Sequence, residues 1–258
     1  MNTCRFTQLR PCIENFGDAQ TIDQSSLARL TLASEGPITV TYAPFDHIPT
    51  AARLAVVGIT PGRVQAETAL KAAALAMRAG NSIEESLRLA KLTASFSGTQ
   101  TRNNLVAMLD AIGLSSTFGV TSCAELFDPA REQIHFTSAL RYPVFVNGKN
   151  FNGSPTKTPL LRRMIETYLA EEVAALSAAL WLPLGPKPAI ALQHLVKMGV
   201  LPARNVLNGV PHPSGLNGER VAAFPGRFDS KNASIKTNVA KLTMAKRDLC
   251  RLVAGLLA

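Results

Sequence analysis

Cysteine and aromatic residues are scarce in this chain of 258 residues, which has four cysteines and only 6% aromatic residues. Four scattered cysteines are too few for a disulfide framework. Cys4 and Cys12 are separated by seven residues, which matches no usual zinc or iron–sulfur spacing. We therefore expect reduced, unpaired thiols and no metal site.

Long apolar runs are also missing. None approaches the ~20 residues that span a bilayer, and the longest candidate, around 174–184, is interrupted by Ser177 and Pro183. The N-terminus has no apolar signal core, and Glu14 and Asp18 follow soon after it. These features predict a soluble, cytoplasmic protein with no membrane partner.

Charged residues make up 17% of the chain and hydrophobic residues 47%. This balance excludes a disordered chain or a coiled coil and suffices for one sizeable α/β core. Acidic residues are outnumbered by basic ones, 18 to 27, and the excess is localised. Five basic and no acidic residues lie between Gln133 and Ile165, and eleven basic and three acidic residues lie from Lys187 onward. The asymmetry suits a polyanionic partner, although a merely soluble basic surface is an equal alternative on charge alone.

Continuous apolar runs alternate with helical segments, which predicts parallel strands buried on both faces. The pattern indicates a single-domain α/β protein, a three-layer α/β/α sandwich with a central, mainly parallel four-stranded sheet. A polar stretch at 146–159 is expected to be a loop. The four expected strands lie at 54–58, 134–140, 178–185 and 205–209, and the main expected helices at 63–78, 83–94, 103–112, 159–176 (capped by Thr158) and 188–198.

A last helix is expected at about 232–257. One stripe of it would carry Ile235, Val239, Leu242, Leu249 and Val253, with lysine and arginine filling much of the remainder.

The first strand is followed by Gly58-Ile-Thr-Pro-Gly62, a tight turn into a helix. Pro61 fixes one backbone torsion, Gly62 permits close approach of a ligand, and the following helix start offers N–H groups to an anion or carbonyl oxygen. Alone the turn is weak evidence, because many α/β proteins have a structural turn of this kind.

The fourth strand is followed by Val210-Pro-His-Pro-Ser-Gly-Leu-Asn217. His212 is held between two prolines, Ser214 and Gly215 can donate to a phosphate, and Leu216 lies at the tip of the loop. An isolated histidine is more often structural, and an isolated loop leucine usually covers a core.

Taken together and in this order, the two segments resemble the signature motifs of the uracil-DNA glycosylase superfamily. Gly58–Gly62 resembles its water-activating loop, which reads Gly-Ile-Asn-Pro-Gly in the mismatch-specific branch, and His212–Leu216 resembles its histidine-containing, minor-groove loop. Phe96 and the residues after it resemble the segment with the base-stacking aromatic, and Phe136–Leu140 resembles the strand that reads the uracil edge. The resemblance spans about residues 53 to 224 and leaves out residues 1–50 and the last helix.

The resemblance implies base flipping and hydrolysis of an N-glycosidic bond. His212 would donate to the departing pyrimidine, Thr60 occupies the water-activating position, and Leu216 would fill the vacated base stack. The implied catalytic residues are His212 and Thr60, the implied base pocket is Gly58, Ile59, Pro61, Gly62, Phe96 and Ser138, and the implied DNA contacts are Pro213, Ser214, Gly215, Leu216 and Arg220.

Two residues depart from the family pattern. Thr60 stands where an Asp or Asn is usual, and a hydroxyl can orient a water but cannot act as a base near neutral pH. Gln65 and Glu67, one turn later, are possible substitutes. Ser138 stands where many members have an Asn, which should loosen selectivity for uracil.

We therefore expect a DNA glycosylase for uracil or another deaminated base, acting as a monomer on DNA without a cofactor. One alternative is a non-catalytic DNA-binding member of the same fold. Another is an enzyme for a free nucleoside or small nucleotide, against which the basic C-terminal segment and Leu216 argue.

Overall fold

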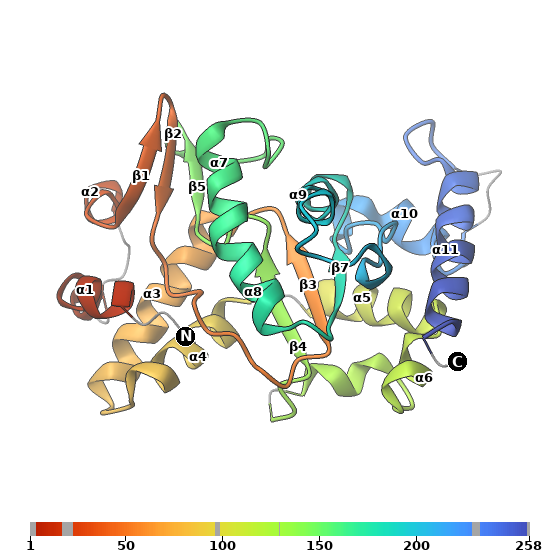
Figure 1. Cartoon of the computed structure of the whole chain (residues 1–258), viewed down its shortest axis with the longest axis horizontal. Coiled ribbons are helices and arrows are strands. Elements are labelled where there is room, and N and C mark those ends of the chain that lie inside the picture. Colours follow the sequence, from red (N-terminus) through yellow and green to blue (C-terminus); the bar gives the residue numbers. More distant parts are fainter. Residues whose placement is uncertain (1–3, 17–22, 96–98, 129, 229–232, 257–258) are drawn as a thin grey trace. The chain divides into compact units, whose positions relative to one another are not determined.

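The computed structural model describes residues 4–16, 23–95, 99–128, 130–228 and 233–256 (Figure 1). They form an α/β protein with one parallel and one antiparallel sheet, which confirms the predicted class. No helix in these described ranges is both long and apolar enough to cross a membrane.

Contacts divide the chain into two compact units. The first unit contains Met1–Thr50, Gly58–Ser95 and Phe136–Ala175, and the second contains Ala51–Val57, Phe96–His135 and Leu176–Ala258.

The parallel sheet has the order β4 (Ile134–Ser138), β3 (Leu54–Gly58) and β7 (Leu180–Pro183), which confirms three of the four predicted strands. Every residue of β7 is buried, as is most of β3, in keeping with their continuous apolar sequence. Within the described residues the predicted fourth strand is reduced to a single parallel bridge between Trp181 and Val206. A 3₁₀ turn ends at Asn205 and Gly209 has a φ of 122°, so the extended run between them is too short for a ladder.

A second, antiparallel sheet lies in the first unit and was missed by the sequence analysis. It joins β1 (Thr31–Glu35), β2 (Ile38–Thr41), β5 (Val144–Val146) and β6 (Lys149–Asn150) in that order. The expected loop at 146–159 therefore begins as a hairpin. Its turn is Asn147-Gly148, with φ values of 48° and 74°, the left-handed conformation that two-residue hairpin turns favour.

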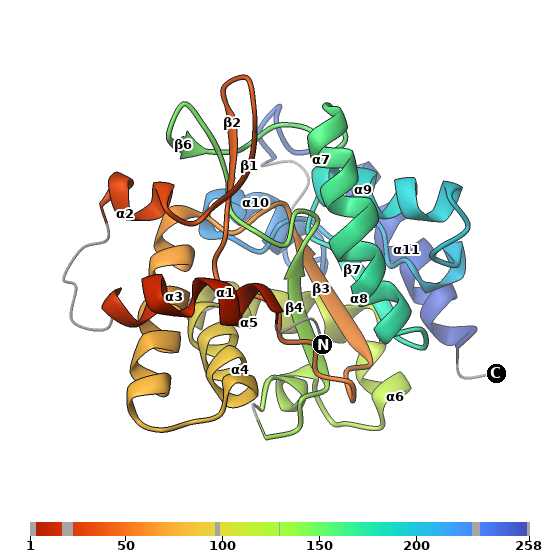
Figure 2. The same cartoon turned by 60° about the vertical axis from the view of Figure 1, so that its left-hand side comes forward.

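The helices of the first unit pack on one another and, through α7, on the antiparallel sheet. Alanines on the buried face of α3 allow close packing against α4, and α1 also contacts α3 (Figure 2). Helix α7 packs on β1 and begins at Pro159, where the Thr158 side chain accepts a hydrogen bond from Leu161 N. The elements are α1 (Cys4–Ile13), α2 (Gln24–Ala28), α3 (Arg63–Arg78), α4 (Ile83–Ala94), α7 (Pro159–Met164), a π-helical turn (Ile165–Leu169) and α8 (Ala170–Ala175).

The second unit places α9 on β7 and α10 on α11. Here the predicted last helix is wrong at its start. The Asn238 side chain accepts a hydrogen bond from Lys241 N and caps α11, which begins at Val239, so Ile235 lies outside the helix and its apolar stripe. The helices are α5 (Thr99–Ala111), α6 (Leu114–Phe118), α9 (Pro186–Lys197), α10 (Gly218–Ala223) and α11 (Val239–Ala254).

Candidate functional site

The glycine–proline turn of the first unit leaves the end of the parallel strands. The carbonyl oxygen of Gly58 accepts a hydrogen bond from Ala139 N at 2.8 Å, and that of Ile59 accepts one from Leu140 N at 3.0 Å. A Cβ atom on Gly58 would lie 3.5 Å from Ser138 Oγ. The structure therefore brings Gly58, Ile59 and Ser138 together, as the resemblance implies.

The Thr60 side chain is fixed to the neighbouring chain. Its hydroxyl group donates to the carbonyl oxygen of Tyr142 at 3.1 Å and accepts from Val144 N at 3.1 Å. A hydroxyl has one proton and two lone pairs, so one lone pair stays available to a water molecule. Thr60 can orient a water in this arrangement, but its hydroxyl group cannot act as a general base near neutral pH.

The start of α3 is closed by side chains of the protein itself. Gly62 N donates to Gln65 Oε1 and Arg63 N donates to Asn150 Oδ1, each at 3.0 Å. A Cβ on Gly62 would lie 3.2 Å from Asn150 Nδ2, so the glycine permits this approach. Gln65, expected as a possible substitute for Thr60, thus holds the turn, and Pro61 is buried beside it. Asn150 was missed, although the Asn147-Gly148 hairpin signal could have placed it.

Buried polar groups support this turn. Tyr142, whose carbonyl oxygen binds Thr60, donates its phenolic hydrogen to Asp46 at 2.5 Å, and Tyr42 donates to the same carboxylate at 2.7 Å. Burial raises the pKa of Asp46, and the two tyrosine hydrogen bonds oppose that rise. Asp46 therefore holds the Tyr142 ring whose backbone holds Thr60.

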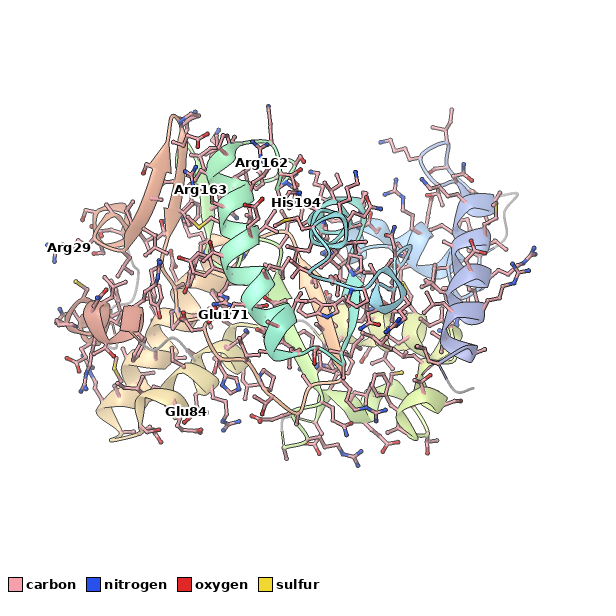
Figure 3. The ribbon with its side chains drawn as sticks, in the orientation of Figure 1. Arg29, Glu84, Arg162, Arg163, Glu171 and His194 are labelled. Carbon is pink, nitrogen blue, oxygen red and sulfur yellow. The ribbon has the colours of Figure 1, made fainter. Side chains whose placement is uncertain are left out.

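Arg141, the residue before Tyr142, forms a buried ion pair. Its guanidinium donates to Glu172 at 2.6 Å, to Glu171 at 2.9 Å and to the carbonyl oxygen of Tyr168 at 2.7 Å. Glu171 lies on the helix that carries Arg162 and Arg163 at its other end (Figure 3). Burial alone would lower the pKa of Arg141, but the Glu172 charge raises it above its usual range. Arg141 therefore stays charged and ties α8 to the chain beside the turn.

Lys91 supplies the second buried cation of the first unit. Its ammonium group donates to the carbonyl oxygens of Phe45 at 3.0 Å and His47 at 2.6 Å. Burial lowers the pKa of Lys91 to about 8, against the opposing effect of the Glu172 charge. The sequence analysis named neither Lys91 nor Asp46, because nothing around them in the sequence marks a buried charge.

In the second unit, His212 lies in a rigid loop. The prolines on either side of it are buried, and Asn104 of α5 donates to the carbonyl oxygen of Pro213 at 2.8 Å. Ser214 N donates to His212 Nδ1 at 3.2 Å. Since Nδ1 accepts, the neutral ring carries its hydrogen on Nε2. Partial burial lowers the pKa of His212, which favours this neutral form.

The tip of this loop is a 3₁₀ turn, Gly215–Asn217. Asn217 Nδ2 donates to the carbonyl oxygen of His212 and to Ser214 Oγ, both at 3.3 Å, and Arg220 donates to Asn217 Oδ1 at 3.5 Å. The Leu216 side chain is 100% exposed. The loop thus presents one apolar side chain on a hydrogen-bonded frame.

The second unit contains the predicted residues from His212 to Arg220, and the first contains Gly58 to Gly62 and Ser138. Phe96, the predicted base-stacking aromatic, lies outside the described residues. In the described ranges, no group of three or more His, Cys, Asp or Glu side chains could hold a metal ion.

Comparison with known proteins finds a relative in Bacillus subtilis (strain 168), the "Uncharacterized protein YoxB". It is 33% identical over 248 residues, which cover 92% of this chain and 96% of the relative. No family model and no solved structure matches the chain.

Proposed function

The chain belongs to the same family as the Bacillus subtilis protein YoxB, and from its residues we propose that it is a DNA glycosylase. The enzyme hydrolyses the N-glycosidic bond of uracil or a related deaminated base in DNA and leaves an abasic site. The proposal includes the finer architecture, a three-layer α/β/α sandwich like that of the uracil-DNA glycosylase superfamily. It requires no cofactor, and the partner is DNA, bound by a monomer.

The observation that carries the proposal is the state of His212. Cleavage of a glycosidic bond places negative charge on the departing base, and a fixed hydrogen-bond donor stabilises that charge. The bond from Ser214 N to Nδ1 sets the tautomer in which Nε2 is the donor, and the flanking buried prolines restrict the backbone that carries the exposed ring. His212 is thereby prepared to donate to a departing pyrimidine without first being protonated.

DNA binding is supported by the loop tip that follows. Leu216 is fully exposed, and an apolar side chain of this kind can fill the space left by a flipped base. Arg220 is exposed beside it, and a guanidinium is well suited to phosphate oxygens. Ser214 adds its hydroxyl and Gly215 its backbone N–H to the proposed phosphate contacts.

The attack of water is the step of the proposed reaction that the residues of this chain assist least. The one free lone pair of Thr60 accepts a hydrogen bond from a water and so orients it. Orientation without general-base catalysis gives a slower enzyme, because base catalysis contributes typically 10²–10⁴-fold. The proposed activity is therefore modest.

The engagement of Thr60 favours a second candidate, a non-catalytic DNA-binding member of the same fold. The hydrogen bonds of its hydroxyl group to the backbone have a structural purpose, so Thr60 needs no role in chemistry to explain its presence. This protein would bind and flip a base through Leu216 without cleaving the glycosidic bond.

One experiment separates the two candidates. The pure protein is incubated with end-labelled oligonucleotides that carry uracil, hypoxanthine or xanthine, as single strands and opposite each base, and alkali then cleaves abasic sites. Cleavage that His212→Ala abolishes establishes a glycosylase and identifies its lesion. Salt-sensitive binding without any cleavage establishes the non-catalytic candidate. The absence of both binding and cleavage refutes both candidates.

A further inference from the structure

A tight turn before α11 presents a second exposed apolar side chain. Ser234–Thr237 is closed by a hydrogen bond from Thr237 N to the carbonyl oxygen of Ser234 at 2.9 Å, which places Ile235 and Lys236 at its tip. Thr237 is buried, whereas Ile235 is fully exposed. The turn is thus anchored at its end and open at its tip.

Two residues at the start of α10 hold this turn. Glu219 accepts hydrogen bonds from Ser234 N at 3.2 Å and from Ser234 Oγ at 2.6 Å, and Arg220 donates to the carbonyl oxygen of Lys236 at 2.8 Å. The hydrogen bonds to Glu219 lower its pKa, so it stays ionised and keeps its grip at neutral pH. The tip is therefore held in place rather than free to bury Ile235.

The same few residues of α10 connect the turn to the His212 loop. Arg220 also donates to Asn217 Oδ1 at 3.5 Å, and Asn217 follows Leu216. Leu216 is 100% exposed and Ile235 is 103% exposed, whereas Val64, the next most exposed large hydrophobic residue in the described ranges, is 76% exposed. The two most exposed large hydrophobic side chains of the described residues thus lie in two segments that Arg220 links.

Folding gives no reason for this exposure, because burial of an isoleucine stabilises a protein and the turn forgoes it. Among the described residues, the exposed cations Lys236 and Arg220 lie in the turn and against it, and Lys241 follows in the first turn of α11; the carboxylate of Glu219 accepts hydrogen bonds from Ser234. Apolar tips among cations suit a duplex, in which phosphates flank a base stack that side chains can enter.

We propose that Ile235 is a second DNA-inserting residue that acts with Leu216 as a two-pronged wedge on duplex DNA. The proposal rests on the proposed function, because it needs a protein that opens a duplex. Leu216 occupies the space of the flipped base, and Ile235 enters a neighbouring base step, where it widens the groove and stabilises the opened duplex. Lys236, next to Ile235, binds the adjoining phosphate.

The test measures binding of a uracil-containing duplex with 2-aminopurine beside the uracil, and of the matching single strand. Wild type is compared with Ile235→Ala, Leu216→Ala and the control Met244→Ala, which removes an exposed apolar side chain from α11. We expect Ile235→Ala to weaken duplex binding about tenfold and to reduce the 2-aminopurine fluorescence increase. Single-strand binding should be unchanged, and Met244→Ala should behave as wild type.

Duplex binding and 2-aminopurine signals of Ile235→Ala that equal those of wild type would overturn the two-pronged wedge while leaving the proposed function intact. Equal losses on duplex and single strand would also overturn it, since a wedge acts only on stacked pairs. A wild-type protein that binds no DNA would refute both proposals. Because the Ile235 side chain is fully exposed, its replacement should leave the melting temperature unchanged.

Discussion

The hydroxyl group of Thr60 donates a hydrogen bond to the carbonyl oxygen of Tyr142, 3.1 Å away, across 82 positions of sequence. The same hydroxyl accepts from Val144 N, so one side chain holds the glycine–proline turn against the strand β5. Thr60 therefore stabilises the contact between the turn and β5, whether or not it also orients a water.

Replacing Thr60 with valine should therefore destabilise the protein. The substitution keeps the shape but leaves Val144 N and the Tyr142 carbonyl oxygen without their partner, at a cost of about 1–3 kcal/mol. Thr60→Ser keeps the hydroxyl and should lose much less. Urea unfolding measures the stability of both variants, and equal stability of Thr60→Val and wild type would contradict this stabilising role of the Thr60 hydroxyl.

Asp46 and Tyr142 should be energetically coupled. Asp46→Asn weakens acceptance from two phenols and Tyr142→Phe removes one of them, so each change affects the same hydrogen bond. A double-mutant cycle measured by chemical denaturation should give a coupling energy of about 0.5–3 kcal/mol. Strict additivity would mean that the short contact adds nothing to stability.

The ion pair between Arg141 and Glu172 should show the behaviour of a buried pair. Arg141→Met removes the guanidinium that donates to the fully buried Glu172 carboxylate and should cost about 3–5 kcal/mol, whereas Arg141→Met with Glu172→Met should recover most of that loss. The control is Arg131→Met, whose partners Glu125 and Asp128 are exposed, with an expected cost of at most about 1 kcal/mol. A double variant as unstable as Arg141→Met would count against this interpretation.

Lys91 should make stability rise with pH in the alkaline range. The native pKa is lowered to about 8 from 10.5, so between these values the unfolded chain binds more protons than the native one. The free energy of unfolding of wild type, relative to Lys91→Met, should therefore increase from pH 8 to 10 by up to about 1.4 kcal/mol per pH unit. Denaturation at several pH values checks this, and a constant difference would show that Lys91 keeps an ordinary pKa.

His212→Ala should slow excision by about a hundredfold or more and leave DNA affinity nearly intact, because the donor acts on the departing base rather than on binding. Wild-type activity should be constant above the ordinary histidine pKa of 6.5 and persist somewhat below it, since burial lowers the pKa. At lower pH, protonated Nδ1 faces Ser214 N–H and the loop loses that hydrogen bond. A pH–rate profile tests this, and unchanged excision by His212→Ala would remove the proposed role.

Periodicity predicted the elements whose burial decides their structure. The bounds of β3, α3 and α4 agree with the expected ranges. In a mostly buried strand and in two alanine- and leucine-rich helices, the local sequence pattern is enough to determine the secondary structure. The start of α11 was placed wrongly because Ile235 fits the helical period, whereas the Asn238 cap and the anchored turn before it oppose a helix there.

What could not be predicted depends on contacts between distant residues. Strand β2 pairs with β5, about a hundred residues later, as well as with β1, and Asp46 is tolerated in the interior because Tyr42 and Tyr142 both donate to it. Neither partnership leaves a local pattern. In the candidate site, the sequence predicted the turn of Thr60 and the loop of His212, but it did not predict that Gln65 and Asn150 would close the start of α3.

The pairing of β2 with β5 also has a consequence for synthesis. Thr39 pairs with Phe145, so β2 leaves the ribosome about a hundred residues before its partner, a delay of about 5 to 20 seconds at ordinary translation rates. During that time the β1–β2 hairpin has an open edge with apolar Ile38 and Val40, the kind of edge that recruits other chains. Nascent chains of this protein should therefore depend more on chaperones before β5 emerges than after it.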